Sequence, residues 1–179
     1  DVLDQYHRHI HFLDNIRAEV SDKKSFLDVT EPKPLYPDTT LVEDGEARAV
    51  IVAPGEAEWA PFTAEVAAAI EAATGVALPI ITSDDASEER LAATNAIVIR
   101  SIANNRALLY PYSHQLTFAD GVYPGDGGYE LRTVPDPWGT GKNMIAIGAS
   151  DLAGAQAALE VLRPHLTEGE TLTVPSLLE

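Results

Sequence analysis

The sequence predicts an α/β (α+β) domain built on a small mixed β-sheet, and three observations carry this prediction. Short apolar runs rich in Val and Ile recur from residue 48 onward and have the length of buried strands. A long Ala-rich segment between the first two runs repeats apolar residues at helical spacing. The runs at 129–134 and 143–148 are joined by a Pro- and Gly-rich turn, which indicates an antiparallel hairpin.

The first half of this domain alternates strands and helices. Residues 48–53 (RAVIVA) are expected to form a strand, and residues 57–74 a helix. Pro61 fits this helix because it falls in the first turn, where proline is tolerated. Gly75 is expected to end the helix in the left-handed conformation. The following elements are a strand at 78–82, a short helix with Ser87 as its N-cap, and a strand at 96–100.

The second half adds a hairpin and a last helix. Residues 103–126 are expected to hold a short helix and an aromatic-rich loop. The hairpin strand 129–134 alternates like a strand with one solvent-exposed face. A helix capped by Ser150 or Asp151 should run to about Leu166, and residues 172–174 are expected to add an edge strand.

Residues 1–45 differ in composition from the rest. Residues 2–20 carry apolar side chains at spacings of three and four, which predicts a helix. Pro32, Pro34 and Pro37 follow among charged residues, which is typical of an extended arm. The sequence therefore predicts an N-terminal helix and arm at 1–45 and the α/β domain at 46–179.

The charge of the chain excludes two classes of partner. Twelve Lys and Arg oppose 28 Asp and Glu, which gives a formal net charge of −16. Nucleic acid and anionic lipid both require cationic protein surfaces, so neither is expected to bind. No apolar run approaches the roughly 20 residues of a membrane-spanning helix, so no membrane insertion is expected. The absence of cysteine excludes disulfides and thiolate metal sites.

Several ordered motifs resemble a known family of domains. The motifs are ATG at 73–75, LPII at 78–81, NAIVI at 95–99, GDGGYEL at 125–131 and NMIAIGASDLAGAQAAL at 143–159. In this order, over residues 47–166, they are similar to the domain that precedes the catalytic barrel in β-N-acetylhexosaminidases and α-glucuronidases. The resemblance implies a mixed sheet packed on one side by two helices, a secreted protein, and a non-catalytic domain that supports the barrel.

The resemblance transfers no catalytic residue to this chain. β-Hexosaminidases use an adjacent Asp-Glu pair in the barrel, and this dipeptide does not occur in the sequence. Asp120, Asp126 and Asp136 are the best candidates for a glycosidase pair of carboxylates, but the favoured interpretation is that they shape turns. The chain is therefore expected not to be an enzyme and to need no cofactor.

The glycine-containing turns do not match nucleotide-binding motifs. Gly141 and Lys142 have the order of a phosphate-binding loop, but Asp136 stands where the motif needs its first Gly. Asn143 follows the lysine where the motif needs Ser or Thr. The segment 125–128 leads into a strand, whereas a dinucleotide fingerprint opens a helix.

One candidate metal site lies in the N-terminal helix. Asp4, His7, His11 and Asp14 share one face of a helix, and His7 and His11 are four residues apart. Two imidazoles and a carboxylate are ligands that Zn²⁺ accepts. The alternative interpretation is a solvated polar face, because a single helix supplies few ligands.

The aromatic residues of the later loops are candidate carbohydrate contacts. They are Tyr110, Tyr112, Tyr123 and Trp138, and aromatic rings stack on sugar rings. The alternative interpretation is that they cover the sheet or contact a catalytic barrel.

Two hypotheses of function follow. The first is a non-catalytic accessory domain of a secreted carbohydrate-active protein, whose partners are a catalytic domain or a carbohydrate. The second is a self-assembling extracellular filament subunit, in which residues 1–45 join one copy to the next. An arm that adds to a neighbour's sheet edge gives head-to-tail contacts, and such contacts build filaments when they do not close.

Overall fold

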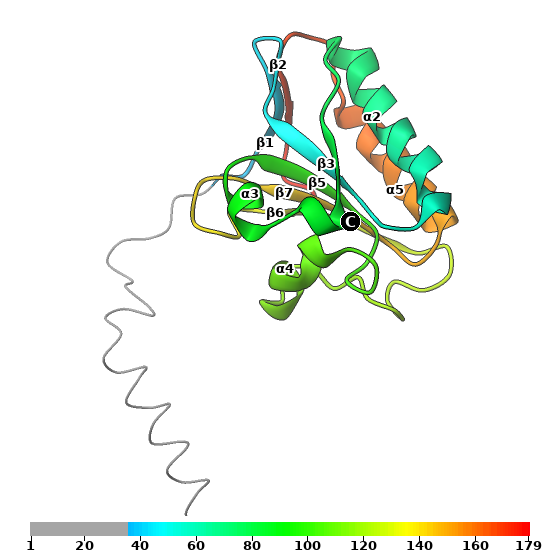
Figure 1. The fold of residues 1–179 in the computed structure, drawn as a ribbon. Helices are drawn as coiled ribbons and strands as arrows, with labels where there is room; N and C mark the ends of the chain where they lie inside the picture. Colours follow the sequence, from blue (N-terminus) through cyan, green and yellow to red (C-terminus); the bar gives the residue numbers. More distant parts are fainter. Residues whose placement is uncertain (1–35) are drawn as a thin grey trace, which may run out of the picture. The chain divides into compact units, whose positions relative to one another are not determined.

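The fold is taken from a computed structural model that describes residues 36–179. The described residues belong to one compact unit (Figure 1). The predicted helix at 2–20 and the candidate metal ligands Asp4, His7, His11 and Asp14 lie outside the described residues.

A mixed five-stranded sheet forms the centre of this unit. Its strands are β3 (Ala49–Ala53), β4 (Ile80–Thr82), β5 (Asn95–Ile99), β6 (Tyr129–Val134) and β7 (Met144–Ala149). Their order is β4-β3-β5-β7-β6. β4, β3, β5 and β7 are parallel, and β6 pairs antiparallel with β7. The predicted α/β fold with a small mixed sheet is confirmed, and so is the hairpin.

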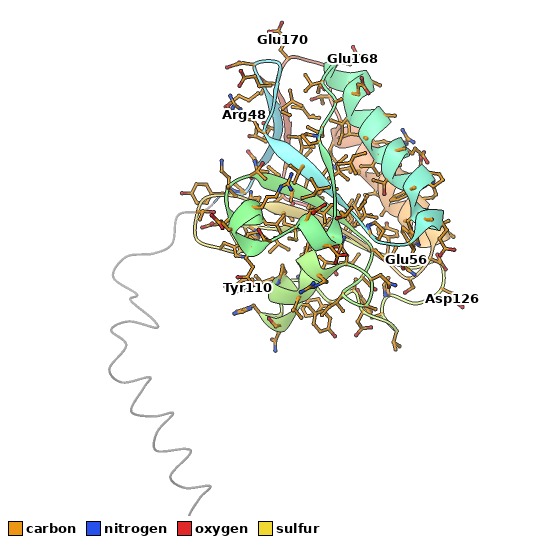
Figure 2. All side chains as sticks on the ribbon, in the orientation of Figure 1. Arg48, Glu56, Tyr110, Asp126, Glu168 and Glu170 are labelled. Atoms are coloured by element: carbon orange, nitrogen blue, oxygen red, sulfur yellow. The ribbon has the colours of Figure 1, made fainter. Side chains whose placement is uncertain are left out.

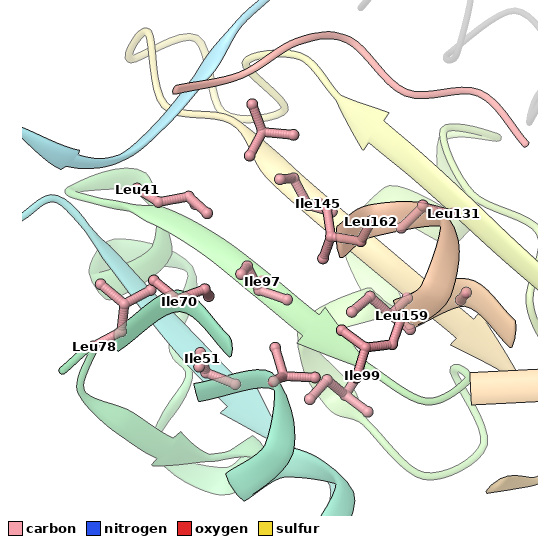
Figure 3. Close-up of a cluster of buried hydrophobic side chains, with 14 of the residues drawn as sticks. Leu41, Ile51, Ile70, Leu78, Ile97, Ile99, Leu131, Ile145, Leu159 and Leu162 are labelled. Atoms are coloured by element: carbon pink, nitrogen blue, oxygen red, sulfur yellow. The ribbon is translucent and has the colours of Figure 1, made fainter. Parts of the chain in front are cut away.

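The two long helices lie side by side on one face of this sheet (Figure 1). They are α2 (Ala60–Thr74), preceded by a 3-10 turn η1 (Ala57–Trp59), and α5 (Leu152–Leu162), followed by η4 (Arg163–His165). Figure 3 shows the core beneath them, in which Ile70 and Leu159 are buried with Ile97 and Ile145. Gly75 ends α2 with a φ of 73°, as predicted.

Short elements cover the opposite face. They are η2 (Ser83–Asp85), α3 (Glu88–Ala92), η3 (Arg106–Leu108) and α4 (Leu109–Ser113). Leu91 and Leu108 lie there in a second apolar cluster with Val98 and Val134. Since both faces are covered, the predicted solvent-exposed face of β6 is wrong: four of its six residues are buried, and the other two are intermediate.

A second, three-stranded sheet combines the first two strands of the described residues with the last one. It has the order β2-β1-β8, with β1 (Thr39–Glu43), β2 (Glu46–Ala47) and β8 (Leu172–Val174). Leu41 and Val42 of β1 are fully buried in the core under the long helices. The predicted boundary near residue 45 is therefore placed too late, because it separates β1 from the domain whose core it joins. The predicted edge strand at 172–174 is β8.

The last residues of the chain cover the outer edge of β6. Leu131 N–H donates to Glu179 O, and Glu179 N–H donates back to Leu131 O, both at 3.0 Å. Thr133 N–H donates to Leu177 O at 2.9 Å. The main chain of β6 is thus hydrogen-bonded on both sides, and this edge of the sheet is protected.

Candidate functional site

The predicted aromatic residues fall into two separate groups. Tyr110, in α4, and Trp138, in the turn between β6 and β7, lie together with ring centroids 6.1 Å apart and planes inclined by 30°. His114 stacks on Tyr110 with a centroid distance of 4.0 Å. Tyr112 and Tyr123 belong to a different hydrogen-bonded group, described below.

Asn105 fixes the segment that carries Tyr110. It is fully buried, and its side-chain NH₂ group donates to Val52 O at 3.2 Å and Ile99 O at 2.9 Å. Its side-chain oxygen accepts from Ala107 N–H at 3.1 Å and so caps η3. The start of η3 and α4 is thereby attached to the ends of two neighbouring strands.

The turn that carries Trp138 is held by a carboxylate and an amide. Asp136 has a φ of 43°, and its carboxylate accepts from Gly141 N–H at 2.7 Å. Its own N–H donates to the side chain of Asn143 at 2.9 Å. Asp136 therefore shapes a turn, as the sequence predicted.

A cavity of about 250 Å³ lies beside Tyr110 and Trp138. Leu91 and Ala107, both buried members of the second apolar cluster, contribute to its lining. The indole Nε1 of Trp138 is buried and has no hydrogen-bond partner among the residues that the structure describes.

Charged side chains also line this cavity. Asp84, Glu88 and Arg106 contribute to it, and Arg106 Nη1 lies 4.0 Å from Asp84 Oδ1. The main-chain N–H of Arg106 donates to Ser83 Oγ at 2.8 Å, which joins η3 to η2. The arrangement offers an aromatic surface together with acceptors and one cationic donor, and it can hold a small ligand that is apolar on one side and polar on the other.

Tyr112 and Tyr123 meet at Asp120. Tyr112 OH donates to one carboxylate oxygen at 2.9 Å, while the N–H groups of Val122 and Tyr123 donate to the other at 2.7 and 2.8 Å. The N–H of Tyr123, followed by that of Val122 and the Tyr112 hydroxyl, holds the pKa of Asp120 below its usual value. The same bond to Asp120 raises the pKa of Tyr112. Asp120 also shapes a turn, as predicted.

The carboxyl ends of the parallel strands form a second polar centre, which the sequence did not reveal. Arg100 follows β5 with a φ of 91°, and its guanidinium donates to Ala149 O at 3.0 Å and to Ser150 O. Its Nε lies 3.6 Å from Glu56 Oε1. The guanidinium also lies 4.3 Å from the ring centroid of Trp59. Residues after β3, β5 and β7 thus meet at one side chain.

Asp151 joins a glycine-rich loop to the same end of the sheet. Its carboxylate accepts from Gly154 N–H, which caps α5, and from Gly127 N–H, both at 2.8 Å. These bonds, the one from Gly154 first, lower the pKa of Asp151. Glu56 and Asp126 both lie at this end of the molecule (Figure 2). Asp126 is exposed in the loop between the two glycines, 125 and 127.

The structure does not place the predicted metal residues, since they lie outside its described part. Within residues 36–179, no group of three or more His, Asp or Glu side chains could hold a metal ion. None of the helices in this range is long and apolar enough to cross a membrane.

No family model matches this chain, and no curated protein matches it either. The resemblance to the domain before the hexosaminidase barrel therefore rests on the sequence motifs alone.

Proposed function

We propose that the chain is a non-catalytic accessory domain of a secreted carbohydrate-active protein and that it supports a catalytic partner or domain. The observation that carries this proposal is that charged and polar side chains at the carboxyl ends of the parallel strands bond to the protein's own main chain. Ligands of open α/β sheets bind outside these ends. In this chain Arg100, Asp151 and Asn105 bond there to main-chain groups and hold strand ends and loops together.

A second feature fits a supporting role, because the loop at 118–123 exposes apolar side chains. Val122 is 85% exposed, Tyr123 is 49% exposed and Phe118 is 42% exposed. Exposed aromatic and aliphatic side chains that lie close together are typical of protein interfaces.

Two carboxylates hold this loop in one conformation. Asp120 accepts the N–H groups of Val122 and Tyr123. Glu130, which is buried in β6, accepts the N–H groups of Phe118 and of residue 119 at 2.9 and 3.1 Å. A surface that is already ordered loses little conformational entropy when a partner binds. The ordered apolar loop at 118–123 is therefore suited to form an interface with a partner protein.

The test measures the thermal stability of glycoside hydrolase catalytic domains from the same source, with and without the full chain. We expect the chain to raise the Tm of one of them in a saturable manner, because binding to the folded state stabilises it. Val122→Asp should abolish the rise. Leu178→Asp is the matched control, since Leu178 is 72% exposed in the C-terminal tail, and it should leave the rise unchanged.

Two outcomes would overturn the proposal. The first is hydrolysis of aryl glycosides by the purified chain at a rate that a point substitution abolishes. The second is assembly into filaments, seen by light scattering and negative-stain microscopy. Filaments that are lost when residues 1–34 are deleted, a change that keeps β1 in the domain, would favour the alternative function of a self-assembling extracellular subunit.

A further inference from the structure

We propose that the cavity beside Tyr110 and Trp138 binds a single sugar residue that carries no acidic group. This inference rests on the proposed carbohydrate-active role and names the class of ligand. It assigns the contact to Tyr110 and Trp138 together with Arg106 and Asp84, and it leaves Tyr112 and Tyr123 out of the site.

The size of the cavity limits the ligand to one ring. The cavity has a volume of about 250 Å³, whereas pockets for drug-sized ligands span roughly 300–1,000 Å³. Tyr110 and Trp138 bring aromatic rings to it from elements that are distant in sequence. The C–H face of a pyranose packs on such rings, while its edge carries the hydroxyl groups.

The charged groups of the lining match the chemistry of these hydroxyls. A sugar hydroxyl donates one hydrogen bond and accepts others. The carboxylates of Asp84 and Glu88 are acceptors, and the guanidinium of Arg106 is a donor. Both kinds of partner are therefore present in the same cavity as the aromatic rings.

The same groups disfavour an acidic sugar. The cavity is lined by two carboxylates, those of Asp84 and Glu88, but by only one guanidinium, that of Arg106. This guanidinium already lies 4.0 Å from the Asp84 carboxylate. The whole chain carries a formal charge of −16, which repels anions approaching from solution. A uronic acid would bring its carboxylate into this negative field, whereas an uncharged sugar would not.

The cavity is formed before any ligand arrives. Ser83 Oγ accepts from the main chain of Arg106, and Ser87 Oγ accepts from Arg90 N–H at the start of α3. Asn105 ties η3 to the sheet beneath. Because these bonds fix the surrounding main chain, binding requires little rearrangement of the site.

The experiment is a titration of the full ¹⁵N-labelled chain, followed by ¹H–¹⁵N correlation spectra. The chain has two tryptophans, so Trp59→Phe assigns the two indole N–H signals. Trp59 is 1% exposed and contacts Arg100 instead of the cavity, so its signal is an internal control. The probes are the neutral hexasaccharides of cellulose, xylan and mannan, and hexagalacturonate as the acidic counterpart.

We expect at least one neutral hexasaccharide to shift the Trp138 indole signal and to leave that of Trp59 in place. For a single ring the expected Kd is about 1 mM, from the usual affinity per non-hydrogen atom. Hexagalacturonate should bind at least about tenfold more weakly at low salt.

Two substitutions locate the site. Tyr110→Ala should raise the Kd about tenfold, since it removes one aromatic surface. Arg106→Gln should raise it about threefold or more, because a charged donor is lost. Tyr123→Ala is the matched control, since it removes an exposed tyrosine of the other aromatic group, and it should change the Kd by less than about twofold.

The proposal is overturned if no neutral probe moves the Trp138 signal, if hexagalacturonate binds as tightly as the neutral probes, or if Tyr110→Ala and Tyr123→Ala weaken binding equally. A failure of this kind leaves the supporting role intact, because the stabilisation of a catalytic partner is measured independently. Conversely, the loss of that stabilisation would overturn the supporting role without changing the titration.

Discussion

Arg100 connects the ends of three parallel strands through one side chain. It follows β5, bonds to carbonyl oxygens at the end of β7, and pairs with Glu56, which comes after β3. Its φ of 91° is unfavourable for a residue with a side chain. Such a conformation persists only where the surroundings enforce it, and here the bonds of the guanidinium supply that constraint.

We predict that Arg100→Met lowers the free energy of unfolding by about 3 kcal/mol, because it leaves Glu56 unpaired and two carbonyl groups without a donor. The Arg100 side chain is only 15% exposed, so water replaces it poorly. Arg106→Met is the control, because Arg106 is 79% exposed and pairs with Asp84 at the surface. Its effect should stay within about 0.5 kcal/mol. Urea denaturation followed by circular dichroism measures both, and equal effects would contradict the role of Arg100.

Asp151 makes the stability of the fold depend on pH. The N–H groups of Gly154 and Gly127 lower its pKa in the folded state. A lowered pKa stabilises the fold above the ordinary Asp value of about 3.9, and this contribution is lost as the pH falls through the folded pKa. We predict that the free energy of unfolding of the Asp151→Asn variant, which retains a capping side chain, decreases less steeply below about pH 4 than that of the parent chain. Urea midpoints between about pH 6 and about pH 2 test this, and identical slopes would refute it.

The residues predicted correctly from the sequence act on their immediate neighbours. Ser87 caps α3 by accepting the N–H of Arg90, three residues away. Gly75 and Pro61 likewise act through their own backbone geometry. Arg100 and Asn105 could not be predicted, because each bonds to residues about 50 positions away in the chain. Such contacts exist only after the sheet has formed.

At the scale of elements, hydrophobic periodicity was sufficient for strands with continuous apolar runs and for the two long helices. It failed for β1, whose buried Leu41 and Val42 are flanked by polar residues and prolines. It also failed for one face of β6, which was predicted to be exposed to solvent but is covered. The short helices that cover this side of the sheet have no clear apolar periodicity in their sequence. Short elements form where tertiary packing stabilises them, and the spacing of apolar residues in the sequence does not reveal that packing.

The C-terminal tail contributes to stability through one of two adjacent leucines. Leu177 is 5% exposed and belongs to the core, whereas Leu178 is 72% exposed. We predict that Leu177→Ala lowers the free energy of unfolding by about 2 kcal/mol, because it opens a cavity. Leu178→Ala should change it by less than about 0.5 kcal/mol. Chemical denaturation measures the pair.

A related outcome concerns association. If the tail detaches in Leu177→Ala, the edge of β6 loses its partner at Leu131 and Thr133. Exposed strand edges pair with other chains, so this variant should also show a concentration-dependent mass in light scattering. Equal stability losses for the two leucine variants would mean that the tail is held by its main-chain bonds alone.

At the scale of the whole molecule, the candidate carbohydrate site depends on the order of the strands. Tyr110 follows β5, and Trp138 follows β6, which is separated from β5 by β7 in the sheet. The aromatic composition of the loops indicated the residue type, but only the topology selects this pair from the four predicted residues. The other two tyrosines meet at Asp120 instead.

The net charge of −16 acts on the molecule as a whole. Like charges repel more strongly when the chain is compact, so the fold should be weakened at low ionic strength. Raising NaCl from about 0.01 M to about 0.15 M shortens the screening length from about 30 Å to about 8 Å. We predict a rise in Tm of about 2–4 °C, which corresponds to about 1 kcal/mol for a domain of this size. Differential scanning calorimetry measures the change, and a Tm that falls with salt would contradict the prediction.

The same measurement distinguishes screening from specific binding of a metal. Micromolar ZnCl₂ adds almost no ionic strength, so a rise in Tm that it causes reports a specific site. The candidate ligands are Asp4, His7, His11 and Asp14. If they hold a metal, His7→Ala combined with His11→Ala should abolish the effect of zinc and preserve that of NaCl, because imidazoles bind Zn²⁺ whereas screening depends on the total charge. An equal response to zinc in the parent chain and in this variant would remove these four residues as a metal site.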